Sequence, residues 1–253
     1  MNGFKTLLFK ELKEQFRTFR LLIVSGVFLF FGLSSPLLLK YLPEIIKASG
    51  QDITGIPLPA PTALEALREY SGTALQVGLL IVVLITMGAI AGERSRGTAV
   101  MTLSKPVGIG AFVTAKLIAI SSTFIIGLVI GGVGAFGYSQ LLFGGADLNG
   151  FVGQTLLLAV FLIFCVATTL VFSAVVKNSL AAGGISIAIL ITGAALTQLP
   201  WVGRGIPNSL TTWGNQLVAG GGGRTEWLAL GIKVFLIGIG AYIAAVILKR
   251  KEI

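Results

Sequence analysis

The residues best suited to contact a partner protein lie together in one short stretch, residues 93–106. The stretch combines ion-pairing side chains, a glycine, a helix cap, apolar side chains and a proline: Glu93, Arg94, Arg96, Gly97, Thr98, Met101, Leu103, Lys105 and Pro106. Glycine can break a helix, threonine can cap the next one, and proline must end it. The pattern predicts a short amphipathic helix able to dock against a partner. A simple turn helix carrying basic residues fits the same spacing.

Catalytic chemistry is poorly supported by the composition. The chain has no histidine and one cysteine, Cys165, which excludes a His-ligated metal, a Ser-His or Cys-His nucleophile pair and an internal disulfide. No lysine follows a glycine, so the phosphate-binding G-x-x-x-x-G-K-[ST] loop is missing. We therefore expect no catalytic, metal-binding or cofactor-binding residues, and the chain cannot hydrolyse ATP by itself.

The hydrophobic segments of the sequence indicate which structural elements flank the 93–106 stretch. The 253 residues are 55% hydrophobic and only 11% charged, with a mean hydropathy of +0.93. A membrane-spanning helix needs roughly 20 mostly apolar residues. Six segments meet that requirement, and they predict an all-α membrane protein with transmembrane helices at residues 21–40, 72–92, 111–138, 151–176, 179–199 and 227–248. Lys233 interrupts the last segment, and we expect its ammonium group to extend to the membrane interface.

The basic residues indicate the orientation of these helices. Of the 19 Lys and Arg residues, thirteen flank one side of the predicted membrane, and six are assigned to the other: Lys40, Lys47, Arg68, Arg204, Arg224 and Lys233. Cytoplasmic segments carry the excess of basic residues. The asymmetry predicts a multi-pass protein of the cell membrane with both termini in the cytoplasm. The net charge of +9 is explained in this way, without nucleic acid as a partner.

The remaining segments belong to the same single domain, residues 1–253. Residues 1–20 predict an amphipathic helix at the membrane interface, with an apolar face that includes Phe4, Leu8, Leu12, Phe16 and Phe19. The first external segment, residues 41–71, should hold a loop and a small helix capped by Thr62 and Glu65. The second, residues 200–226, should hold short helices and three tryptophans at the membrane interface: Trp201, Trp213 and Trp227.

Small residues at helical spacing predict close packing within the bundle. Gly127 and Gly131 share one face of the third predicted span, and Gly184 and Ala188 share one face of the fifth. Small residues four positions apart let two backbones approach closely.

Two sequence patterns resemble those of a known family, the ABC-2 type permeases, which are membrane subunits of ABC exporters. The first is Glu93-x-x-x-Gly97-Thr98 followed by Leu103-Ser104-Lys105-Pro106, and the second is Phe9-Lys10-Glu11-Leu12 before the first span. Ala99 departs from the family pattern, in which a leucine usually follows the Gly-Thr pair.

The resemblance implies a mechanism and a set of partners. It implies that residues 93–106 contact an ABC ATPase, present in two copies, and that this partner binds ATP and Mg²⁺. It also implies a second permease subunit, identical or similar, and a translocation pathway lined by spans two and five.

Two classes of function remain open on the sequence. The first is a permease subunit of an ATP-driven exporter, and the second is a non-transporting membrane scaffold or accessory subunit of an assembly complex. An ion-coupled carrier is disfavoured because the predicted spans hold no Asp, Glu, His or Arg. Thr86, Thr192 and Gln198 are candidate pathway-lining residues, but they are neutral and do not identify a substrate.

Overall fold

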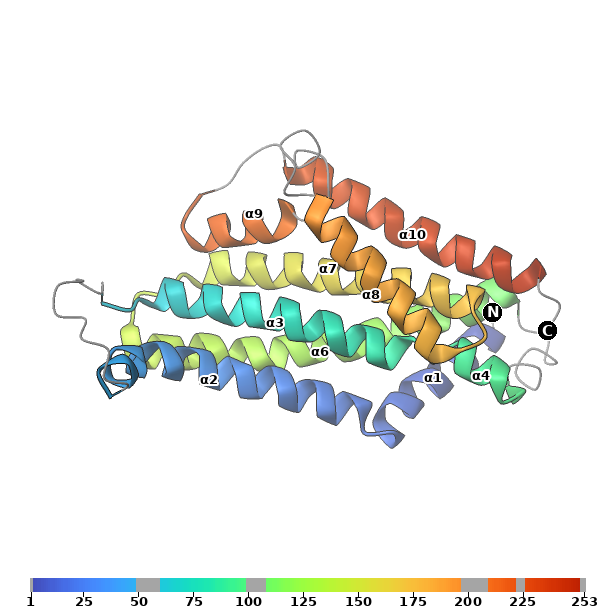
Figure 1. Ribbon diagram of the computed structural model, residues 1–253, viewed down its shortest axis with the longest axis horizontal. Coiled ribbons are helices and arrows are strands. Elements are labelled where there is room, and N and C mark those ends of the chain that lie inside the picture. The colour runs from blue at the N-terminus through green and yellow to red at the C-terminus, as the bar shows by residue number, and fades with distance from the viewer. Residues whose placement is uncertain (1, 49–59, 99–107, 197–208, 222–225, 251–253) are drawn as a thin grey trace.

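The computed structural model describes residues 2–48, 60–98, 108–196, 209–221 and 226–250. Every element in these ranges is a helix (Figure 1). In chain order they are α1 (Asn2–Arg17), α2 (Arg20–Ala48), α3 (Ala63–Thr86), α4 (Ala91–Ser95), α6 (Ile109–Phe143), α7 (Leu148–Val175), α8 (Ser179–Leu196), α9 (Ser209–Val218) and α10 (Glu226–Arg250). The all-α prediction is confirmed for the described residues.

Five of these helices are long and apolar enough to cross a membrane, by length and composition. They are the segments Arg20–Ile46, Ala63–Ser95, Ile109–Phe143, Leu148–Val175 and Trp227–Arg250. A shorter apolar helix, Ser179–Ala195, corresponds to the fifth predicted span. The chain is therefore a multi-pass membrane protein, and the count of six spans stays a prediction.

The centre of the bundle is formed by α6 and α7. Half of the most apolar stretch of each is buried inside the chain, against 11% for α10. In Figure 1, α2, α3, α6 and α7 run side by side, while α8 crosses α7 and α10 lies along the outside. The starts of α3 and α7 lie at one end of the bundle, and α1 and α4 lie at the other.

Close backbone approach joins α2 to α6, as the spacing of Gly127 and Gly131 predicted. A Cβ atom on Gly131 would lie 2.5 Å from the carbonyl oxygen of Phe28, and one on Gly127 would lie 2.8 Å from a methyl of Val24. The corresponding prediction for α8 is wrong within this chain, because Gly184 and Ala188 are exposed. Gly183 makes the intrachain contact instead, against Met87.

Two predicted boundaries in the first external segment are wrong. α2 continues through Pro43 to Ala48, because apolar residues such as Leu42 and Ile45 extend the helix beyond the first charged residue. The Thr62 capping box is present: the Glu65 N–H donates to Thr62 Oγ1 at 3.3 Å, and the Thr62 N–H donates to Glu65 Oε2 at 3.1 Å. The helix that it starts is not separate, since no residue breaks α3 before Thr86.

The position of Lys233 also differs from the prediction. Its side chain is 0% exposed, and its Nζ lies 4.2 Å from the ring centroid of Phe161 and 5.4 Å from that of Phe164. Both rings belong to α7. Lys233 does not reach the interface because its helix phase directs it at α7, where aromatic faces attract the ammonium group.

The second external segment forms one described helix. α9 packs on α7, and Gly220, with a φ of +79°, follows its end. Trp213 is only 6% exposed and packs edge-on against Trp227, with ring centroids 5.0 Å apart. Trp213 is therefore a core residue, whereas Trp227 is 64% exposed, and Trp201 lies outside the described residues.

Candidate coupling junction

The turn between α3 and α4 is held by one serine of α7. The Ser173 hydroxyl accepts hydrogen bonds from the N–H groups of Ile90 and Ala91, at 3.1 and 3.0 Å, and donates to the Met87 carbonyl at 2.8 Å. Ser173 is 0% exposed. Because Ser173 satisfies backbone groups that the helix break leaves unpaired, the start of α4 is fixed on α7.

The chain leaves α4 through a glycine in a left-handed conformation. Gly97 has a φ of +72°, and its N–H donates to the Arg94 carbonyl at 3.2 Å. The Thr98 hydroxyl donates to the Glu93 carbonyl at 3.2 Å, and Arg94 Nη1 donates to the Ala174 carbonyl at 2.9 Å. Glycine adopts positive φ without steric cost, so the predicted break at Gly97 is confirmed.

A buried lysine joins the segment to two other helices. Lys116 Nζ, on α6, lies 2.6 Å from Glu93 Oε1 and 3.0 Å from Glu11 Oε2 of α1. The side chains of Lys116, Glu11 and Glu93 are 3%, 4% and 11% exposed. Because these side chains are almost excluded from water, each charge depends on its ion-pair partner for stabilisation. The three residues thereby link α1, α4 and α6.

Additional polar groups surround this ion cluster, which we define as Glu11, Glu93 and Lys116. Glu14 brings a third carboxylate close to those of Glu11 and Glu93, a grouping that could in principle hold a cation. The Lys116 ammonium already bonds two of these carboxylates, and this chemistry favours an ion-pair cluster over a metal site. Glu93 Oε2 and the buried Gln15 Oε1 have no hydrogen-bond partner among the described residues.

The structure places the predicted docking residues in three different settings. Glu93 is turned into the bundle, Arg94 is half-buried against α7, and Arg96 is exposed. Four others lie outside the described residues: Met101, Leu103, Lys105 and Pro106. The assignment of residues 93–106 to coupling stays a prediction.

The N-terminal helix presents two faces. Phe4 and Leu8 pack against the hydrophobic core, where Leu7 is buried, and Leu12 is half-buried. Phe16 and Phe19 are 62% and 65% exposed. The helix ends at Arg17, before Phe19, whose φ of +57° breaks the continuity expected through residue 20.

The candidate pathway residues are not brought together. Thr86 is buried at the end of α3, and its hydroxyl has no hydrogen-bond partner in the described part of the chain. Thr192 is exposed on α8, and Gln198 lies outside the described residues.

Sequence reasoning missed Glu11, Lys116 and Ser173. Lys116 is one of the thirteen basic residues from which the orientation was predicted. One feature could have singled it out: it lies seven residues after Ile109, where α6 begins, and so about 10 Å along that helix. A lysine at that depth calls for a partner. Nothing in the local sequence identifies Glu11 as a partner of Lys116, or Ser173 as the residue that bonds the turn between α3 and α4.

The described helices define an α-helical membrane protein. Its short helix α4 is held to three other helices of the bundle, α1, α6 and α7. Residues 6–216 match the family model described as ABC-2 family transporter protein, and the chain belongs to this family. It is thus a transporter permease of the ABC-2 type, a family of membrane subunits. It is also similar to the uncharacterized transmembrane protein YxlG of Bacillus subtilis (strain 168), with 28% identity over 191 residues, covering 75% of this chain and 74% of the relative.

Proposed function

We propose that this chain is the permease subunit of an ATP-driven exporter, works as a dimer, and receives its driving force from a separate cytoplasmic ATPase through residues 93–106. Family membership supports the general class. Two sets of contacts support the proposal most directly. Glu93 is ion-paired with Lys116, which also pairs with Glu11, and Ser173 bonds the backbone of the preceding turn. A force applied at Thr98 would reach α1, α6 and α7 through these contacts.

The placement of the helix ends supports the proposed orientation. α1 and the C-terminal end of α10 lie at the end of the bundle that holds α4 (Figure 1). With thirteen basic residues against six, that end is the cytoplasmic one. An ATPase in the cytoplasm would then have access to Arg96, which is exposed beside Gly97.

The surface of α8 supports a second permease subunit. Gly184 and Ala188 leave an exposed strip of small residues on this helix, and Leu180 and Ile185 beside it are 73% and 40% exposed. Small residues permit close approach of another helix in the membrane. Under this proposal the pathway lies between two subunits, while ATP and Mg²⁺ are bound by the two ATPase copies.

Charge reversal at Arg96 tests the coupling role without disturbing the buried contacts. The experiment uses the chain co-purified with its ATPase in lipid nanodiscs, and compares Arg96→Glu with Lys177→Glu, an exposed lysine between α7 and α8. We expect Arg96→Glu to lower permease-dependent ATP turnover roughly tenfold or more, corresponding to at least about 1.4 kcal/mol of lost interaction. Lys177→Glu should leave turnover near that of the unmodified complex.

The result also separates an exporter subunit from a scaffold. A scaffold would bind a partner without altering its ATP turnover, so the unmodified chain would give no stimulation at all. Equal turnover for Arg96→Glu, Lys177→Glu and the unmodified chain, with stimulation present, would place the coupling contact elsewhere.

A further inference from the structure

One face of α1 remains exposed in the folded chain and combines aromatic with basic side chains. Phe9 and Phe16 are 69% and 62% exposed, and Lys10, Lys13 and Arg17 are exposed beside them. At 3.6 residues per turn, these five positions fall within about 120° of the helix circumference. The opposite face is the one buried against the bundle. Phenylalanine and basic residues on one face are typical of a helix that lies on an anionic membrane surface.

Two of these charges are available to an external anion. Lys13 and Arg17 lie one helical turn apart, and neither forms a hydrogen bond or ion pair with another described residue. The acidic residues of the same helix have other partners: Glu11 belongs to the ion cluster, and Glu14 lies 4.0 Å from Arg20. Like charges four positions apart repel one another, so an anion bound between them is stabilising.

An apolar groove begins beside these charges, where α1 gives way to α2. Its volume is about 490 Å³, and six of its eight lining residues are Phe, Leu or Ile. Phe16 and Phe19 line its start, and Ile130 of α6 lies on its other wall. The α2 wall extends from Leu21 to Leu29, about 12 Å along the helix. We call this feature the α1–α2 groove.

The two features together define the chemical class of the ligand. Lys13 lies three positions before Phe16, and Arg17 follows it, so both charges border the start of the groove. A matching ligand has an anionic group at one end and a hydrocarbon chain that extends from it. An anionic phospholipid has this form, whereas the choline of a zwitterionic lipid would be repelled. A second copy of this chain, docked symmetrically, would bring two further basic residues to the same place.

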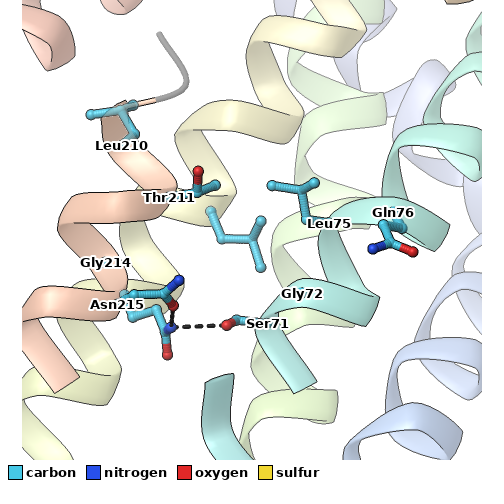
Figure 2. Close-up of a pocket in the computed structure, with 10 residues that line it drawn as sticks. Ser71, Gly72, Leu75, Gln76, Leu210, Thr211, Gly214 and Asn215 are labelled. Carbon is cyan, nitrogen blue, oxygen red and sulfur yellow. Dashed lines mark hydrogen bonds between the residues drawn. The ribbon is translucent and has the colours of Figure 1, made fainter. Parts of the chain in front are cut away.

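A hollow at the other end of the bundle lacks this combination. It lies between α3, α7 and α9, has a volume of about 210 Å³, and has no charged residue among the ten that line it. Its polar groups bond one another: Gln154 Nε2 donates to Ser71 Oγ at 2.8 Å and to Asn215 Oδ1 at 2.7 Å, as the dashed lines in Figure 2 show. Gly72 also lines this hollow, which makes it a neutral control position.

We propose that the α1–α2 groove binds one anionic phospholipid, with its phosphate at Lys13 and Arg17 and one acyl chain along α2. This site is independent of the coupling proposal, because its residues belong neither to the ion cluster nor to the 93–106 segment. Each basic residue close to an anionic headgroup adds about fivefold in affinity. Two such residues should therefore favour an anionic lipid by roughly tenfold or more.

Lipid titration of the full chain, delipidated in detergent, provides the test. Native mass spectrometry follows the binding of dioleoylphosphatidylglycerol and dioleoylphosphatidylcholine, which have the same acyl chains and differ in net charge. We expect the Kd for the first bound phosphatidylglycerol to be lower by roughly tenfold or more. Glycerol 3-phosphate carries the anionic group without the chains and should not displace the lipid.

A pair of double variants tests the contribution of charge. Lys13→Gln combined with Arg17→Gln should reduce the preference for phosphatidylglycerol to about twofold or less. Lys249→Gln combined with Arg250→Gln removes the same number of charges from exposed positions at the end of α10, and the preference should persist. All four side chains are exposed, so the thermal midpoints should stay close to that of the unmodified chain.

A pair of leucine variants tests the contribution of the groove. Gly26 lines it, and a Cβ there meets nothing within 4 Å, so Gly26→Leu should fill the space without moving the backbone. We expect this variant to lose the selective binding of phosphatidylglycerol. Gly72→Leu adds the same side chain to the neutral hollow, at a position that is equally open, and selectivity should be unchanged.

Four outcomes would overturn the proposal. The first three are equal affinity for the two lipids, selectivity that survives the Lys13 and Arg17 double variant, and displacement of the lipid by glycerol 3-phosphate. The fourth is a Gly26→Leu chain that keeps its lipid selectivity but dissociates from a dimer to a monomer, which would assign the groove to a second copy. Because the assay requires neither an ATPase nor transport, its failure would leave the coupling proposal untouched.

Discussion

Removal of the Lys116 charge should destabilise the protein strongly. Lys116→Met keeps most of the side-chain volume and deletes the ammonium group, leaving Glu11 and Glu93 as adjacent buried carboxylates. At distances of 3.0 and 2.6 Å and an effective dielectric constant of about 20, the gross attraction is about 6 kcal/mol for each pair. The cost of burying the charges offsets most of this attraction in the intact cluster.

The single substitution loses the attraction but keeps the buried carboxylates. Breaking a buried ion pair from one side costs roughly 3–5 kcal/mol. At about 2–4 °C per kcal/mol for a chain of this size, the thermal midpoint should fall by roughly 6–20 °C. Thermal unfolding in detergent micelles measures the shift. The exposed Lys177 supplies the control, since Lys177→Met should change stability by no more than about 0.5 kcal/mol.

A compensating triple variant gives the reasoning its sharpest test. If the damage comes from orphaned charges, combining Lys116→Met with Glu11→Met and Glu93→Met should recover most of the lost stability, because the whole cluster is then replaced by apolar side chains. A midpoint for Lys116→Met equal to that of Lys177→Met would refute the argument. A triple variant less stable than the single one would refute it as well.

Three further substitutions test other contacts by thermal unfolding. Ser173→Ala leaves two buried N–H groups without an acceptor and should lower the free energy of unfolding by about 2–4 kcal/mol. Ser122→Ala removes only an exposed hydroxyl and should be near neutral; equal effects would contradict the role of Ser173 in holding the turn between α3 and α4. Gly131→Ala should destabilise by about 1–3 kcal/mol through its clash with α2, while Gly137→Ala, which meets nothing, should stabilise slightly by removing a helix glycine; the same sign for both would be inconsistent with the packing. Thr62→Ala should cost about 1 kcal/mol by removing the cap of α3, and an unchanged midpoint would show that the capping box contributes nothing.

Local features of the fold were predictable from the sequence. The capping box at Thr62 and the break at Gly97 each depend on residues within a few positions of one another, and the structure has both. The α6 and α7 spans were predicted to within a few residues because long uncharged stretches dominate them. The boundary of α2 was wrong because charge was taken as the end of the helix, while helix formation depends on the apolar residues that continue past Lys40.

The direction of side chains in the bundle was not predictable in the same way. Lys233 and Lys116 both lie near the ends of apolar helices, and a sequence reading treats both as charges that reach water. The fold places Lys233 against two phenylalanines and Lys116 between two carboxylates. Helix phase, which depends on packing against distant elements, decides between these outcomes.

The ion cluster has a mechanical consequence for the junction. Glu11 and Lys116 are 105 positions apart in the chain, and Lys116 and Glu93 are 23 apart, so tertiary packing brings the three together. A hydrogen bond weakens steeply once its partners separate, and in this buried site water cannot readily replace the lost partner. A shift of α4 must therefore either break one of the two Lys116 bonds or carry α1 and the start of α6 along. Because the broken state holds an unpaired buried carboxylate, joint movement of α1, α4 and the start of α6 is the less costly response.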